Sequence, residues 1–208
     1  SYLLSLSGYG DADMINFFDE DGNFIEPYAA TNTRVGEHLS GMANSLGIRN
    51  VIPFSSFHDY QREDSAWARK YKAPLSAYQV GFSQKLNFIP PFAIVDCATG
   101  EVAHTEVVEM SKELVSPATF GDNWSDELIE SDKKLILNYF RRKEKVNSFV
   151  SFINFRVGGS DNVIRLQGKK NKGITFNLPR TSLMKAINYE IFDDLLIGNF
   201  MRTTLHNM

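Results

Sequence analysis

The sequence predicts a mixed α/β (α+β) fold, and two observations support this prediction. An amphipathic helical pattern over residues 31–46 is followed by Gly47 and by an apolar run over residues 48–54. A helix, the glycine that ends it and a short apolar strand form an αβ unit, and such units usually belong to a sheet that helices cover. Farther along the chain, a second amphipathic helix precedes three strand-like runs.

Hydrophobic periodicity predicts the first elements of the chain. Residues 2–7 form an apolar strand pattern without the polar lead-in that is usual at a terminus. This pattern indicates a chain cut inside a sheet, and a trimmed terminus is the alternative. A second strand is expected over residues 14–18, and residues 19–22 carry a hairpin signal.

The first helix has signals at both ends. Thr31 or Asn32 can cap its start, and Gly47 supplies the left-handed residue that ends it. We expect a short helix over residues 62–71 and a pair of strands around a turn at residues 98–100.

The second half is expected to form a separate domain. Residues 117–123 are polar and contain glycine, so we place a boundary there and expect two domains, 1–120 and 121–208. Ser125 or Asp126 can cap a helix over residues 125–144. Three strands follow, with turns at residues 158–159 and 169–172 between them; they are expected over 149–157, 163–166 and 174–178.

Composition narrows the possible functions. The 208 residues are 43% hydrophobic and 12% aromatic, and the net charge is −3, which is typical of a globular protein. The dense basic runs, residues 141–143 and 169–172, fit a helix end and a turn, so we expect no nucleic-acid partner. No apolar stretch approaches the ~20 residues of a membrane span, and no signal peptide is visible, so we expect a cytoplasmic protein.

The single cysteine limits the possible chemistry further. Cys97 alone cannot form an internal disulfide or a cysteine-rich zinc site. It ends the apolar run over residues 92–97, so we expect a small buried core residue, with a reactive thiol as the alternative.

His58 is the most suggestive ionisable residue. The common metal-protease, nucleotide-loop and nucleophile-elbow motifs are absent from the sequence. His58 follows the apolar strand over residues 48–54 in a segment rich in hydrogen-bonding groups. A neutral imidazole there could bind a metal, and Asp59 or Asp64 could fix its tautomer. The alternative is a loop histidine that hydrogen-bonds to one of these carboxylates.

Other polar residues allow two interpretations each. Asp11 and Asp13 follow the first strand in a glycine-rich turn, where they could bind a metal or could hold the turn by local hydrogen bonds. His38 is expected on a helix surface, and His104 is expected in a hairpin. The acidic pair at residues 193–194 is expected to cap a helix.

The order of elements resembles the second half of a metallo-β-lactamase fold. The resemblance rests on a strand, a glycine-rich acidic turn, a helix, Gly47 and the run Asn-Val-Ile-Pro-Phe over residues 50–54 before His58. It implies half of an αββα sandwich over residues 1–120, followed by a small α+β accessory domain. The family's H-x-H-x-D-H cluster is absent, so the resemblance implies that a missing N-terminal half or a second chain supplies the other ligands.

The resemblance also implies roles for six residues, of which Asp11 and Asp13 are alternatives for one role. His58 would be the final metal-binding histidine, and Asp11 would be the bridging aspartate, with Asp13 as the second candidate. Asp64 and Asp59 would act in catalysis by orienting His58, and Arg62 would hold an anionic group of a small-molecule substrate. The cofactor would be a divalent metal, zinc or iron, whose bound hydroxide makes the protein a hydrolase.

Two further resemblances suggest other functions. Residues 53–57 and 193–203 are similar to stretches of the CMP-N-acetylneuraminate hydroxylase family, in which a Rieske domain accompanies a metallo-β-lactamase-like domain. Residues 148–206 look like a sterol-carrier-protein-type module. The alternatives to a hydrolase are therefore a ligand- or partner-binding module without catalysis and a component of a Rieske-type sugar-nucleotide hydroxylase.

Overall fold

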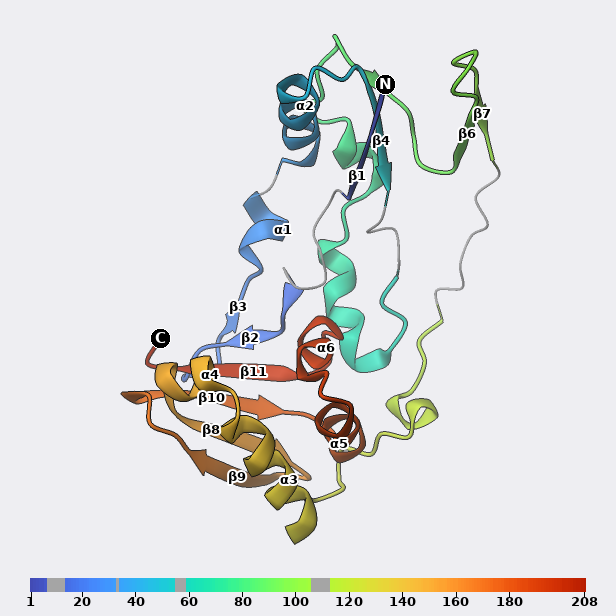
Figure 1. Cartoon of the computed structure of the whole chain (residues 1–208). Coiled ribbons are helices and arrows are strands. Elements are labelled where there is room, and N and C mark those ends of the chain that lie inside the picture. The colour runs from blue at the N-terminus through green and yellow to red at the C-terminus, as the bar shows by residue number, and fades with distance from the viewer. Residues whose placement is uncertain (7–13, 33, 55–58, 106–112) are drawn as a thin grey trace. The chain divides into compact units, whose positions relative to one another are not determined.

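The chain divides into two compact units, whose elements are labelled in Figure 1. The computed structural model describes residues 1–6, 14–32, 34–54, 59–105 and 113–208, with only the backbone of Lys169 and Lys170. The parallel-sheet unit, as we call the first, comprises Ser1–Asp13, Tyr28–Tyr60 and Ala68–Glu113. The second, the six-stranded unit, comprises Met14–Pro27, Gln61–Trp67 and Leu114–Met208.

The fold is a mixture of α-helices and β-sheets, as predicted. The two units differ from the predicted domains 1–120 and 121–208 because two early segments belong with the C-terminal residues. Strand pairing is the reason: Phe17 and Phe18 pair with Thr203 and Thr204 of the last strand. Residues 61–67 join the same unit through a bridge between Arg62 and Val115.

The parallel-sheet unit is built on three parallel strands in the order β1-β4-β5. One face of this sheet is covered by helix α2, where Leu39, Ala43 and Val51 are fully buried together. The elements of this unit and its borders are β1 (Tyr2–Leu6), α1 (Tyr28–Asn32), α2 (Val35–Ser45), β4 (Asn50–Phe54), η2 (Glu63–Tyr71), η3 (Leu75–Tyr78), β5 (Asn87–Phe88), β6 (Ala93–Val95) and β7 (Val102–His104).

The opposite face of this sheet is apolar and exposed. Successive strand residues point to opposite faces, so Leu4 and Leu6 share the face that α2 does not cover. Both are largely exposed, at 61% and 70%. Their partners in the neighbouring strand are Ile52 and Phe54, and Phe54 is 44% exposed. Among the described residues, no element covers this apolar face.

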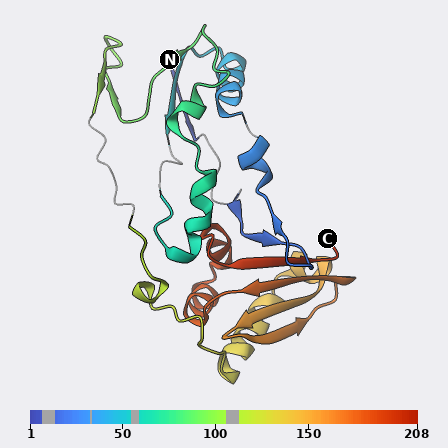
Figure 2. The same ribbon diagram turned by 180° about the vertical axis from the view of Figure 1, so that it is seen from behind.

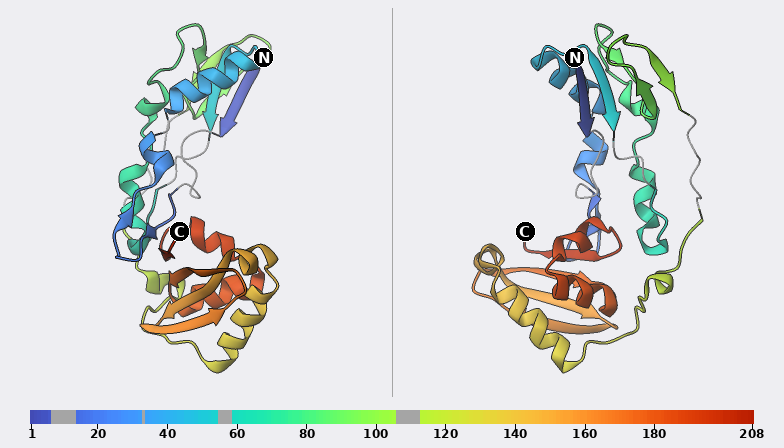
Figure 3. Two further views of the ribbon diagram at one scale, coloured as in Figure 1. Left: turned by 90° about the vertical axis from the view of Figure 1, so that its left-hand side faces the viewer. Right: turned by 45° about the vertical axis from the view of Figure 1, so that its right-hand side comes forward.

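The six-stranded unit contains a mixed sheet in the order β3-β2-β11-β10-β8-β9. Helices α3 and α4 lie on one face of its central strands, as Figures 1, 2 and 3 show. The elements of this unit are β2 (Phe17–Phe18), β3 (Phe24–Ile25), η4 (Pro117–Phe120), α3 (Glu130–Arg141), α4 (Glu144–Phe149), β8 (Val150–Val157), β9 (Ser160–Arg165), β10 (Lys169–Asn177), α5 (Arg180–Tyr189), α6 (Phe192–Ile197) and β11 (Arg202–His206).

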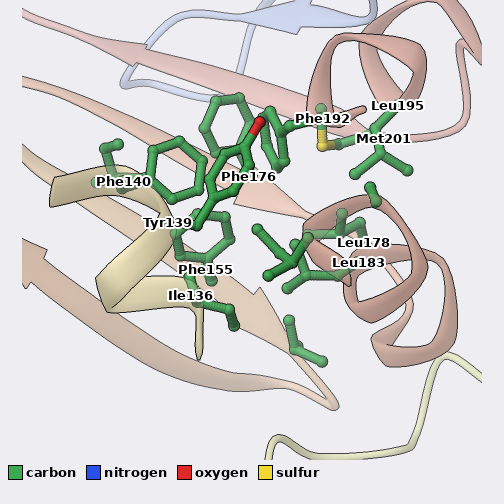
Figure 4. Packing of buried hydrophobic residues seen from close by; sticks show 14 of the residues in the cluster. Ile136, Tyr139, Phe140, Phe155, Phe176, Leu178, Leu183, Phe192, Leu195 and Met201 are labelled. Atoms are coloured by element: carbon green, nitrogen blue, oxygen red, sulfur yellow. The ribbon is translucent and has the colours of Figure 1, made fainter. Parts of the chain in front are cut away.

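Aromatic rings fill the core between this sheet and its helices (Figure 4). The ring of Phe192 lies 5.0 Å from that of Phe140 and 5.0 Å from that of Phe176, in edge-on contacts. Ile153, Phe155 and Val157 alternate along β8 and are fully buried in the same core. Edge-on ring pairs contribute about 0.5–1.5 kcal/mol beyond the area that they bury, so this core gives the unit its rigidity.

Several predicted elements are confirmed. The helix–Gly47–strand pattern corresponds to α2 and β4, and Gly47 has the expected positive φ of 65°. The predicted turn at residues 158–159 joins β8 to β9, where Gly158 and Gly159 have φ of 61° and 81°. Two consecutive residues with positive φ are typical of a type I′ hairpin turn.

The helix expected over residues 125–144 begins later and is divided. Asn123 and Asp126 hold a local turn through a side-chain hydrogen bond of 2.8 Å, because such side chains compete with helix formation. Helix α3 therefore begins at Glu130, and Asp132 accepts a hydrogen bond from the backbone N–H of Ile129. The prediction that Ser125 or Asp126 caps this helix was wrong.

Two further predictions were wrong. Cys97 is exposed, because it lies in the tight connection between β6 and β7, where Asp96 accepts hydrogen bonds from the N–H groups of Ala98 and Thr99. The lysine run over residues 169–172 belongs to strand β10, with a bulge and a positive φ of 68° at Asn171.

No helix within the described ranges combines the length and the apolar character that a membrane crossing requires.

Candidate functional site

Strands β1 and β4 end side by side in the parallel-sheet unit. They are parallel neighbours, and their last residues, Leu6 and Phe54, are partners in the register. Asp11 follows β1 and His58 follows β4, but both residues lie outside the described residues, as does Asp13. In open α/β sheets, ligands bind at the carboxyl ends of the strands. The segment that contains Asp11 and the segment that contains His58 therefore both leave the sheet at the same edge, after Leu6 and Phe54.

Asp59 is held in place directly after His58. Its Oδ1 accepts a hydrogen bond of 2.9 Å from the N–H of Tyr60 and lies 3.2 Å from Nε of Arg69. The side chain is 16% exposed, and Tyr60 is buried. The described partners of Asp59 are thus Tyr60 and Arg69, and its role in orienting His58 stays a prediction.

Arg62 and Asp64 belong to a buried ionic cluster in the six-stranded unit. Nε of Arg62 donates to Asp64 Oδ1 over 2.6 Å, and the NH1 nitrogen lies 2.7 Å from Asp122 Oδ2. The guanidinium stacks on the ring of Phe200 at 3.9 Å. Burial disfavours the charged guanidinium, but the hydrogen bonds to both carboxylates outweigh burial and raise the pKa of Arg62.

The carboxylates of this cluster have further donors. Trp124 Nε1 donates to Asp64 Oδ2 over 3.0 Å. The N–H and the hydroxyl of Ser182 donate to Asp122 over 2.9 and 2.6 Å. A substrate anion could reach the Arg62 guanidinium only by displacing a carboxylate. The roles proposed for Arg62 and Asp64 stay predictions. In the observed geometry, Asp122 contacts both Arg62 and Ser182, so this ionic cluster connects residues 61–67 with helix α5.

The described histidines do not gather with carboxylates. His38 lies on the exposed side of α2, and His104 is exposed in β7. His206 Nε2 lies 2.8 Å from the hydroxyl of Thr175. Within the ranges that the structure describes, which leave out Asp11 and His58, no three His, Cys, Asp or Glu side chains form a group suited to a metal.

A hollow of about 310 Å³ lies between α3 and β9 in the six-stranded unit. Its lining is apolar apart from three cations, which are Lys133, Arg141 and Arg165, and one amide, that of Asn162. Arg141 and Arg165 also line a more polar hollow of about 810 Å³ beside α4. The basic run over residues 141–143 was expected only to complement the helix dipole, but its first residue, Arg141, lines both hollows.

Comparisons of the chain with family models, with curated proteins and with solved structures give no match. The function is therefore argued from the geometry of the two units and from the residue types at the ends of their strands.

Proposed function

We propose that the parallel-sheet unit is part of a metal-dependent hydrolase in which Asp11 and His58 bind a divalent metal, zinc or iron. The observation that carries this proposal is the paired ending of β1 and β4 at Leu6 and Phe54. Each candidate ligand follows one of these two strand ends, and the carboxyl edge of a parallel sheet is the usual position of a ligand site. Imidazole and carboxylate are also ligand types that zinc prefers.

The proposal assigns different tasks to the chain's own residues. His58 must stay neutral to act as a ligand, and Asp59 is the charged group next to it in sequence. When bound, the metal lowers the pKa of a coordinated water, so that hydroxide forms near neutral pH. The substrate class is a small molecule with an anionic group.

The uncovered sheet face supports the idea that this unit is half of a layered αββα structure. Leu4, Leu6 and Phe54 expose a contiguous apolar surface opposite α2. Exposed apolar patches of this kind mark surfaces that another element covers. A second sheet can pack on such an apolar face, and we propose that a sheet from another segment of the protein or from a second chain supplies the remaining metal ligands.

The test is the metal content of the intact natural protein, measured by elemental analysis. His58→Ala should remove most of the bound zinc or iron and the hydrolase activity with it. His104→Ala is the matched control, because His104 is exposed on β7, and this variant should keep its metal. Equal metal content in the two variants would contradict the role of His58, and an iron–sulfur absorption band would instead favour the Rieske-type oxygenase hypothesis.

A further inference from the structure

We propose that the hollow between α3 and β9 binds a small amphipathic anion, a single short apolar chain that ends in a carboxylate or a phosphate. The hollow lies wholly within the six-stranded unit, so the proposal does not depend on the metal site. A ligand in this hollow would make the six-stranded unit a ligand-binding module, which is the alternative hypothesis from the sequence.

The apolar lining of the hollow suits one short hydrocarbon chain. Ile136, Phe155 and Ile164 are buried core residues that line it. Leu137 of α3 lines it as well and is only partly buried, so apolar surface is accessible to a ligand. The volume of about 310 Å³ is near the lower end of the ~300–1,000 Å³ that is typical of small-molecule pockets. A two-chain lipid therefore does not fit the hollow.

Helix α3 places cations beside this lining. Lys133, Leu137 and Arg141 are spaced four residues apart, so they form one stripe along the helix. All three line the hollow, and Arg165 lines it from the strand side. Lys133 already pairs with Glu130 at 2.8 Å. The stripe thus alternates a cation, an apolar side chain and a cation.

Arg141 and Arg165 are the cations available to a ligand. Among the residues that the structure describes, no carboxylate lies within 4.0 Å of either guanidinium. Both arginines line the apolar hollow and the polar hollow next to it, so they mark the border between the two. A guanidinium binds a carboxylate or a phosphate through two parallel hydrogen bonds.

The apolar lining and the two arginines together select the ligand class. A neutral apolar molecule would leave two unpaired guanidinium groups beside it, and a simple inorganic anion would leave the apolar lining unfilled. A chain that ends in an anionic group satisfies both parts at once, because its tail lies on Leu137 and its head reaches Arg141. The chain's net charge of −3 makes a local cationic border more selective, since general attraction of anions is weak.

The first experiment compares four probes by NMR titration of the chain. We expect octanoate and octyl phosphate to shift the amide signals of α3 and β9 and to bind at least about tenfold more tightly than octan-1-ol or acetate. A tighter response to octyl phosphate than to octanoate would identify the head group as a phosphate. Equal affinity for octanoate and octan-1-ol, or no octanoate binding at millimolar concentration, would overturn the proposal.

Three variants separate the two parts of the site. Arg141→Gln should weaken octanoate binding about tenfold and leave octan-1-ol binding unchanged. Leu137→Gln should weaken both probes, because it removes apolar lining at a partly buried position of α3. Arg142→Gln is the matched control, since Arg142 pairs with Glu190 at 2.8 Å and is not part of the lining. If Arg141→Gln and Arg142→Gln lower octanoate affinity equally, the effect is one of net charge, and the assigned site is wrong.

Discussion

The two units bury their apolar surface in different ways. The six-stranded unit places helices α3, α5 and α6 on one face of its sheet and fills the space between them with aromatic rings. Its other face carries polar contacts such as the ion pair of Arg156 with Asp161. The parallel-sheet unit covers one face of its sheet with α2 and leaves Leu4 and Leu6 exposed on the other. Among the described residues, the six-stranded unit therefore buries its large apolar side chains between one sheet and its helices, whereas the parallel-sheet unit leaves part of its apolar surface exposed.

The strongest test of this comparison removes a ring from the six-stranded core. Phe155 is fully buried and contacts the rings of Phe140 and Phe176. Phe155→Ala should lower the free energy of unfolding of this unit by about 3–5 kcal/mol, because the cavity cannot close. Trp67 and Trp124 both belong to this unit, so tryptophan fluorescence during urea unfolding measures it. Tyr189→Ala, at a position that is 75% exposed, should change the stability by no more than about 0.5 kcal/mol.

The second test asks whether the ionic cluster around Arg62 stabilises the same unit. The carboxylate of Asp122 is fully buried and receives Arg62 and Ser182. Asp122→Asn should cost about 1.5–3 kcal/mol, because the new amide N–H₂ would face either the Arg62 guanidinium or the backbone N–H of Ser182, and both of these only donate. Glu190→Gln is the matched carboxylate-to-amide change in an exposed pair with Arg142, and it should cost at most about 1 kcal/mol. If both variants lower the free energy of urea unfolding equally, the buried cluster stabilises the unit no more than an exposed ion pair does.

The sequence predicted those helices and turns whose ends are determined by residues close together in the chain. The helix that ends at Gly47 and the hairpin at Gly158 and Gly159 depend on φ values that only neighbouring residues decide. Strand β11 was missed, because its sequence Arg-Thr-Thr-Leu-His has no apolar alternation. It forms because β10 and β2 offer their edges on both sides.

Contacts between distant residues limited the prediction of the candidate sites. Arg62 is close to Asp64 in the sequence, but Asp122 and Phe200 complete its surroundings. Arg141 and Arg165 likewise line one hollow only because α3 packs beside β9. Asp11 and His58 were candidates by residue type, and the pairing of β1 with β4 shows that the strands before them end at a common edge. Tertiary pairing of this kind leaves no periodic signal in a single sequence.

The smallest expected effect on stability is in the parallel-sheet unit. Leu6 is 70% exposed, so Leu6→Ser should change hydrogen-exchange protection of β1 and β4 by the equivalent of no more than about 0.5 kcal/mol. The same change should lower the fluorescence of an apolar dye, because it interrupts the surface formed with Leu4 and Phe54. Val80→Ser, at a position of the same unit that is 66% exposed and outside the sheet, should leave the dye signal unchanged. If Leu6→Ser instead removes the protection of β4, the side chain stabilises the unit by itself, and the sheet face is not a surface that awaits a second layer.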